Sequence, residues 1–270
     1  MKSPLKWAGG KSWLTPQLKN IWNLHRLHNP EPRLVEPFCG GLSVALSLNP
    51  HKALLNDINS CLINFFKQLK KGLIIEIPME NNKELYYQHR ARLNELIKKN
   101  NLSKEAAEIF YYLNRTGFNG LCRFNKKGEF NVPFGRYKTI NYIRDFTPYK
   151  NVLKDWEFTN CDFEELKLEP DDFVYADPPY DTVFTQYAQN GFGWADQERL
   201  TKWLSSHPGP VIISNQATPR IIELYQDYGF EIEYFMAPRR ISSNRGRTPA
   251  REVLARKNLI NEYCTMVSCS

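Results

Sequence analysis

Long apolar runs, paired cysteines and a leader-like start are absent from this sequence, and each absence excludes a class of protein. No apolar run approaches the length of about 20 residues that spans a bilayer. Residues 1–6 carry no apolar signal region. The six cysteines are scattered without a Cys-x-x-Cys pair, which fits neither a zinc site nor a disulfide framework. We therefore expect reduced thiols, no metal, no membrane partner and a cytoplasmic location.

The composition is that of a packed globular protein with a basic surface. The chain has 270 residues, enough for one large domain or a core domain with an insertion. Hydrophobic residues make up 42% of it, which is enough for a packed core. The formal net charge is +7, and basic residues gather in residues 123–138 and 239–256. This distribution suits a polyanionic partner.

The tetrapeptide Asp177-Pro178-Pro179-Tyr180 follows an apolar, β-favouring run at residues 172–176. Proline cannot continue a ladder, so the chain must leave the sheet at Pro178. In open α/β sheets, ligands bind beyond the carboxyl ends of the strands. Asp177 and the Pro178 carbonyl would accept both hydrogens of an amine while Tyr180 covers a flat ring. We interpret the segment as the place where an adenine amine becomes nucleophilic, the alternative being a proline-stiffened turn.

A Lys-Trp-Ala-Gly-Gly-Lys motif occupies residues 6–11, just before a helical pattern. Its two glycines let the backbone pass close to a ligand. Trp7 would lie against an adenosine and Lys11 would bind a carboxylate. A Gly-Gly turn with a packed tryptophan is the alternative.

The next stretches resemble the first half of a nucleotide-binding βαβ unit. A strand at residues 33–38 leads into a glycine-containing loop at 39–43 and a helix at 44–48. A second strand at 53–59 carries Asp57, where such folds place the acid that binds ribose hydroxyls. Neither a phosphate loop nor a full dinucleotide fingerprint is present, which argues against a nucleoside triphosphate or NAD. A nucleoside without a pyrophosphate, such as S-adenosylmethionine, fits.

The α/β alternation continues after residue 156. Asp162 and Phe163 close a short strand at 157–159, where they would hold the cofactor's adenine by its amine and its ring face. Residues 184–187 would close over the target base. Further helices and strands are expected at residues 196–204, 210–214, 219–228, 232–235 and 252–255.

Residues 60–114 interrupt this alternation with helical patterns, and we expect an inserted subdomain there. It ends in a segment rich in Asn, Arg and aromatic residues, with an Asn-Lys-Lys-Gly turn signal between two β-type runs. Such a hairpin would enter a DNA groove, where Arg reads guanine. An exposed solubilising hairpin is the alternative. Residues 238–247 suit phosphate contact or a disordered basic loop.

Together these motifs resemble the Dam family of DNA adenine-N6 methyltransferases, of the class with the cofactor loop first, the recognition insert next and the catalytic tetrapeptide last. The resemblance runs from residue 6 to residue 243 and is most specific at 113–138. It implies an α/β, Rossmann-like S-adenosylmethionine-dependent sheet with an inserted, mainly helical DNA-recognition subdomain carrying a β-hairpin. The implied catalytic domain is 1–59 and 157–270, and the insert is 60–156 with its hairpin at 118–138.

The resemblance also assigns roles to individual residues. The catalytic residues are Asp177, Pro178, Pro179 and Tyr180. The expected cofactor-binding residues are Trp7, Ala8, Gly9, Lys11, Glu36, Pro37, Phe38, Gly40, Asp57, Ile58, Asp162, Phe163 and Asp177. The expected DNA-binding residues are Lys6, Arg90, Asn114, Arg115, Phe118, Asn119, Leu121, Arg123, Asn125, Asn131, Pro133, Arg136 and Tyr137.

Among these DNA residues, Arg123 falls where the family reads a guanine, with Leu121 and Pro133 beside a thymine. Lys6 and Tyr137 fall at the first base pair and Arg90 at a phosphate. Phe118 and Asn119 fall where the family inserts into the duplex beside a flipped adenine. The expected target is double-stranded DNA at GATC.

Two positions depart from the family pattern. Residues 38–42 read Phe-Cys-Gly-Gly-Leu and lose the last glycine of Phe-x-Gly-x-Gly, which we expect to shift cofactor affinity. Phe118 stands where a tyrosine is frequent.

The resemblance implies S-adenosylhomocysteine as product, a monomer, a possible restriction endonuclease partner, and action in a bacterial nucleoid or phage-infected cytoplasm. Alternatives are methylation of another amine (cytosine, RNA or protein glutamine) and a silent DNA-binding protein on the same scaffold.

Overall fold

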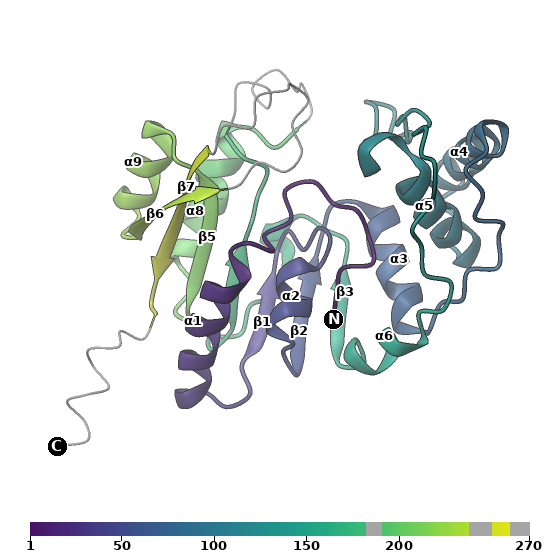
Figure 1. Ribbon diagram of the computed structural model, residues 1–270. Coiled ribbons are helices and arrows are strands. Elements are labelled where there is room, and N and C mark those ends of the chain that lie inside the picture. The colour runs from purple at the N-terminus through teal and green to yellow at the C-terminus, as the bar shows by residue number, and fades with distance from the viewer. Residues whose placement is uncertain (182–190, 238–249, 260–270) are drawn as a thin grey trace.

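The computed structural model describes residues 1–181, 191–237 and 250–259, which form a mixed sheet with helices on both faces (Figure 1). Within these ranges no helix combines the length and apolar character needed to cross a membrane. Residues 184–187 and 238–247, to which the sequence assigned a base lid and phosphate contacts, lie outside the described residues.

The described sheet has seven strands in the order β3-β2-β1-β4-β5-β7-β6. β1 to β5 run parallel, and β7 runs antiparallel to both of its neighbours. The chain builds β1, β2 and β3 outward in one direction and then returns to place β4 on the other side of β1, so the order reverses between β1 and β4. The strands are β1 Arg33–Glu36, β2 Lys52–Asn56, β3 Trp156–Thr159, β4 Phe173–Ala176, β5 Val211–Gln216, β6 Glu231–Ala237 and β7 Ala250–Lys257.

Two apolar cores lie on opposite faces of the sheet because successive side chains of a strand point to opposite sides. In β1, Leu34 belongs to one core and Val35 to the other. Helices α1 (Thr15–His28) and α2 (Ser43–Leu48) cover the first face, and α8 (Trp194–Ser205) and α9 (Pro219–Asp227) cover the second (Figure 1). The predicted α/β alternation is confirmed.

A group of helices lies beside the β3 edge of the sheet (Figure 1). They are α3 (Ser60–Lys70), α4 (Lys83–Lys98), α5 (Lys104–Thr116) and α6 (Thr147–Val152). Side chains of Asn59, Asn82 and Ser103 cap the starts of α3, α4 and α5, accepting from the first-turn backbone. Buried aromatic residues of these helices pack into the first core, so helices and sheet share one apolar interior.

The segment expected to form a β-hairpin at 118–138 is closed by only two isolated bridges, Gly117 to Phe134 and Phe124 to Phe130. The expected turn is present, because Asn125 accepts from the backbone of two following residues. The hydrogen bonds beside the turn run from the Asn125 N–H to the Glu129 carbonyl and from the Asn131 N–H to the Arg123 carbonyl. Asn94 of α4 bonds both the N–H and the carbonyl of Phe130, which point away from the partner segment, and so holds this segment against α4.

Candidate active site

A cleft of about 690 Å³ opens at the carboxyl ends of the central strands, where the strand order reverses. In open α/β sheets this reversal is the point where ligands bind. The cleft is lined by residues 7–11, 36–41, 56–58, 161–163 and 177–180, among others. Every residue predicted to bind the cofactor or to act in catalysis therefore lines one cavity, although the sequence separates them by up to 173 positions.

Trp7 packs directly on the loop that follows β1. A Cβ atom on Gly40 would come within 2.7 Å of the Trp7 Nε1 atom, and one on Gly41 within 2.7 Å of the Trp7 Cβ atom. Gly40 also has a φ of +45°, a left-handed conformation that favours glycine. The two glycines thus allow the N-terminal motif and the β1 loop to form one continuous wall of the cleft.

Lys11 makes a buried ion pair with the first residue of the tetrapeptide. Its Nζ lies 3.1 Å from Asp177 Oδ1, 3.1 Å from the Gly9 carbonyl and 4.5 Å from the centre of the Tyr180 ring. Ser214 Oγ donates to the same Asp177 oxygen at 2.7 Å. Burial raises the pKa of Asp177, and the Lys11 charge and the Ser214 hydrogen bond oppose that rise.

Glu252, from the antiparallel strand β7, contacts the other end of the tetrapeptide. Tyr180 donates its phenol hydrogen to Glu252 Oε2 at 2.6 Å, and Lys11 Nζ lies 3.9 Å from the same oxygen. Burial and nearby carboxylates raise the pKa of Tyr180 well above its ordinary value, so the phenol remains a donor. Glu252 and Ser214 were not predicted as site residues from the sequence. The one signal for Glu252 was that it is the single carboxylate of β7.

Buried side-chain amides form hydrogen bonds with the backbone of the tetrapeptide and of the residue that follows it. Gln197 on α8 donates to the Pro179 carbonyl at 2.8 Å, and Asn215 on β5 accepts from the backbone N–H of Asp181 at 3.3 Å. Asn215 also donates to Gln197 at 3.1 Å, which joins the two anchors. Arg220 on α9 forms a two-point ion pair with Asp181. Three elements therefore fix the position of the reactive loop.

The β1 and β2 ends supply two carboxylates to the cleft. Glu36 is 2% exposed, and within the described structure its Oε1 atom has no hydrogen-bond partner. Burial raises the pKa of Glu36 well above its ordinary value, so a cationic ligand beside it would relieve a desolvated charge. Asp57 accepts from the backbone N–H groups of Gly40 and Asn59 at 3.1 and 2.9 Å, which fixes its orientation.

These acceptors fit S-adenosylmethionine. The unpartnered Glu36 oxygen suits the ammonium of the methionine part, and Asp57 suits ribose hydroxyls. Ile58 is 76% exposed and lines the cleft, so its side chain offers an apolar surface for the adenine ring.

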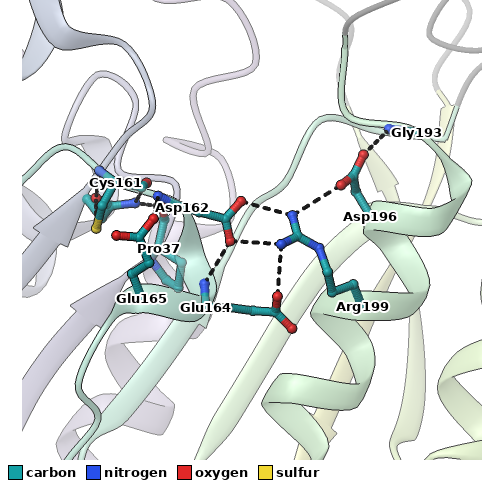
Figure 2. A network of polar contacts seen from close by, with 9 residues as sticks. Pro37, Cys161, Asp162, Glu164, Glu165, Gly193, Asp196 and Arg199 are labelled. Carbon is teal, nitrogen blue, oxygen red and sulfur yellow. Dashed lines mark hydrogen bonds and ion pairs between the residues drawn. The ribbon is translucent and has the colours of Figure 1, made fainter.

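Asp162 and Phe163 lie at the β3 end of the cleft, but in more crowded surroundings than expected. Phe163 is 4% exposed and packs against Phe38, with ring centres 5.7 Å apart, so little of its face is open to a ligand. The Asp162 carboxylate forms a two-point ion pair with Arg199 of α8 at 3.0 and 2.9 Å (Figure 2). Arg199 had not been predicted from the sequence.

The predicted DNA-binding residues fall into two groups, and Asn114 represents the buried one. It is 1% exposed, accepts from the Lys6 N–H at 2.9 Å and donates to the Lys6 carbonyl at 2.8 Å. Lys6 Nζ in turn lies 4.0 Å from the centre of the Tyr137 ring. The structure therefore brings Lys6 and Tyr137 together as expected, while Asn114 binds the Lys6 backbone from inside the protein.

Arg123 is exposed, and its guanidinium is held by a neighbouring residue of the same segment. Its Nε donates to Asn131 Oδ1 at 2.8 Å. Asn125 shapes the turn between them and also donates to Glu129 at 2.9 Å. Of these predicted DNA-binding residues, Arg123 presents a charged group to solvent, Asn131 orients it, and the Asn125 amide is taken up by the turn.

The remaining members of the set are mostly at the surface. Phe118 is 50% exposed and Asn119 beside it has a φ of +53°, a left-handed conformation that Asn tolerates. Arg90 is partly buried, donating to the Val132 carbonyl at 3.2 Å. Pro133 and Arg136 are exposed, whereas Leu121 and Arg115 are partly buried.

The fold and the cleft define a Rossmann-like methyltransferase: an open sheet with one antiparallel strand, a nucleoside-type site at its reversal point and an Asp-Pro-Pro-Tyr loop beside it. The family model of the D12 class N6 adenine-specific DNA methyltransferases matches residues 7–240, and the chain belongs to this family. It is thus an adenine-specific DNA methyltransferase.

Two relatives in sequence agree with this assignment. The chain is 36% identical to the retron Ec67 DNA adenine methylase of Escherichia coli, over 94% of this chain and 91% of that protein. It is 37% identical to the type II methyltransferase M1.LlaDCHI of Lactococcus lactis subsp. cremoris, over 90% and 91% of the two chains. Among solved structures, a precorrin-6y C5,15-methyltransferase from Geobacter metallireducens aligns with a TM-score of 0.39 and 8% identity, over 88% and 87% of the chains.

Proposed function

We propose that this enzyme transfers a methyl group from S-adenosylmethionine to the N6 amine of an adenine flipped out of a GATC site in double-stranded DNA. The observation that carries the proposal is the position of Asp177 and Tyr180. They lie at the reversal point of the sheet, in the same cleft as Glu36 and Asp57. An amine-binding loop and a nucleoside-binding site therefore share one cavity.

The chain's own residues bind and orient both reactants. When bound, S-adenosylmethionine supplies an electrophilic methyl group on a sulfonium and leaves as S-adenosylhomocysteine. Glu36 would bind the ammonium of its methionine part and Asp57 the ribose hydroxyls. The Trp7 wall closes one side of the cleft. Holding the two reactants in line in this way accounts for a large part of the acceleration.

Asp177 orients the adenine amine. Lys11 Nζ and Ser214 Oγ both contact Oδ1, so we expect Oδ2 to accept an amine hydrogen. The Pro178 carbonyl would accept the second hydrogen, which directs the nitrogen lone pair at the methyl group. Tyr180, fixed by Glu252, would stack on the base. As the amine gains positive charge, the Asp177 carboxylate stabilises it, so Asp177 must be ionised.

For DNA recognition we propose residues 60–156 as the target-recognition insert and residues 1–59 with 157–270 as the catalytic part. Arg123, pre-oriented by Asn131, would read a guanine with two hydrogen bonds. Lys6 and Tyr137 would read the first base pair. The exposed Phe118 and Asn119 would enter the duplex and fill the space left by the flipped adenine.

The relatives support two further points as proposals. One of them is named a type II methyltransferase, which favours a partnership with a restriction endonuclease. Another is named a DNA adenine methylase and comes from a bacterium, Escherichia coli, which favours a cytoplasmic site of action. We also propose that the enzyme acts as a monomer, with the product S-adenosylhomocysteine and no metal.

The test is methyl incorporation from labelled S-adenosylmethionine into short duplexes that carry one GATC, each single-base variant of it, or a scrambled control. We expect label only in the adenine of GATC. Label at another sequence would retain the catalytic roles of Asp177 and Tyr180 and refute the GATC assignment. Absence of label from all duplexes, with cofactor bound, would refute both.

A further inference from the structure

Arg199 is a charged residue of the cleft that the mechanism above does not use. Its guanidinium bonds both oxygens of Asp162, at 3.0 Å to Oδ1 and 2.9 Å to Oδ2 (Figure 2). Asp162 comes from the loop after β3, on one side of the point where the strand order reverses. Arg199 comes from α8, which follows β4 in the chain, on the other side of that point. Both residues line the cleft.

The hydrogen bonds to Asp162 leave it one defined acceptor position. An ionised carboxylate has about four lone-pair positions. Oδ1 accepts from Arg199 and from the Glu164 backbone N–H at 3.1 Å, whereas Oδ2 accepts from Arg199. The remaining position belongs to Oδ2, and its direction is set by the plane of the two-point ion pair. A hydrogen-bond donor in the cleft would therefore meet a fixed acceptor.

Arg199 also keeps Asp162 in the form that accepts. Its guanidinium holds the pKa of Asp162 below the ordinary value, so this carboxylate stays ionised and accepts hydrogen bonds without donating. A two-point guanidinium pair is more rigid than a single-point ammonium contact.

Arg199 is itself held by three further contacts. Glu164 accepts from it at 2.8 Å and Asp196 at 3.2 Å (Figure 2). The guanidinium also lies 4.5 Å from the centre of the Phe163 ring. Asp196 is fixed in turn by the Gly193 N–H at 2.8 Å. The Asp162 acceptor is thus oriented by a chain of contacts that begins at the start of α8.

We propose that Arg199 is a positioning residue that aims Asp162 at the exocyclic amine of the cofactor's adenine, and so determines selectivity for adenine over purines that lack this amine. The inference rests on the proposed use of S-adenosylmethionine. In this proposal α8 influences cofactor selectivity indirectly. Arg199 orients the Asp162 carboxylate, and Asp162 makes the contact with the ligand.

The experiment measures binding by calorimetry, with no turnover needed. The two ligands are S-adenosylhomocysteine and its analogue with purine in place of adenine, which lacks only the amine. The variants are Arg199→Met, which keeps an apolar stem against Phe163, and Arg199→Lys, which keeps the charge and loses the two-point geometry. Arg92→Met is the matched control, because Arg92 is also an arginine paired with carboxylates (Glu95 and Glu105), at similar exposure and outside the cleft.

For the unmodified enzyme we expect about tenfold tighter binding of the adenine ligand, the effect of one hydrogen bond to a charged group. Arg199→Met should reduce this ratio at least about threefold, mainly by weakening the adenine ligand, while Arg92→Met leaves it unchanged. The affinity ratio of Arg199→Lys should lie between that of the unmodified enzyme and that of Arg199→Met. In an Asp162→Asn background, Arg199→Met should change the ratio no further.

Three different results would overturn the inference. An unchanged ratio in both Arg199 variants, with thermal unfolding showing them folded, would mean that Arg199 only joins α8 to the β3 loop. Failure of the unmodified enzyme to bind either ligand would refute the proposed cofactor, and the role of Arg199 with it. Equal weakening of both ligands would also count against the inference, since it would indicate a general structural effect.

Discussion

Tyr180 and Glu252 share a hydrogen bond of 2.6 Å although 72 residues separate them. Tyr180 ends the Asp-Pro-Pro-Tyr loop after β4, and Glu252 lies on β7, paired with Gln216 of β5. The ring expected to cover the target adenine is therefore held at its hydroxyl by a strand outside the parallel part of the sheet. The first prediction follows from this contact.

Replacing Glu252 with Ala should lower the rate of methyl transfer by about 10–100-fold while S-adenosylhomocysteine binding changes little, because the stacking ring loses its fixed orientation. Tyr180→Phe should remove the same hydrogen bond, so the double variant should be no slower than the slower single variant. Single-turnover rates test this, and the fluorescence of 2-aminopurine at the target position reports base stacking. Additive losses would refute the coupling.

Lys11 should set the acid side of the pH–rate profile. Burial raises the pKa of Asp177 above its ordinary value of 3.8, and the Lys11 charge opposes that rise. Since ionised Asp177 is the working form, activity is lost as the pH falls through this raised pKa. Lys11→Met should raise the pKa further and move the acid limb to higher pH. Ser214→Ala should move it in the same direction, and an unmoved limb in both variants would contradict this assignment.

Arg123→Ala should relax recognition at one guanine of the target at a cost of about 1–3 kcal/mol in discrimination. Asn131→Ala should produce a weaker form of the same loss, because Asn131 Oδ1 holds the Arg123 Nε. Lys127→Ala is the control, since it removes one exposed charge from the same segment. Methylation rates on the single-base variants of GATC give the measurement. If Arg123→Ala keeps full discrimination, a residue other than Arg123 recognises this guanine.

His25 should make the fold sensitive to mild acid. It is buried, neither ring nitrogen has a partner within the described structure, and burial lowers its pKa below 6.5. The unfolded chain therefore binds a proton at a higher pH than the folded one, and stability present above pH 6.5 is lost as the pH falls toward the folded pKa.

His25→Leu should flatten this loss, whereas His28→Leu, at an exposed position of the same helix, should flatten it less, because the His28 charge is a smaller cause of the lowered His25 pKa than burial. Denaturant unfolding at several pH values across this range measures it. His89, whose pKa burial also lowers, will retain part of the effect.

The helices and strands were largely predictable because each is encoded locally. Apolar runs ending in Glu36, Asp57 and Asp177 mark strands whose carboxyl ends meet at one edge of a parallel sheet, so their convergence followed from topology alone. The expected hairpin was only partly correct. Its turn depends on nearby residues such as Asn125, but its position depends on α4, whose Asn94 bonds the outward-facing backbone groups of Phe130.

The sequence by itself determined the reactive tetrapeptide, the nucleoside-type strand ends and the family, because short-range patterns specify them. Only the tertiary structure decided which side chains complete the site. Glu252 and Ser214 reach it through the pairing of β5 with β7, and Arg199 reaches Asp162 through the packing of α8. Asn114 looks like any polar residue in the sequence, yet it is buried against the Lys6 backbone. Contacts between distant segments depend on how whole elements pack, and no local pattern encodes them.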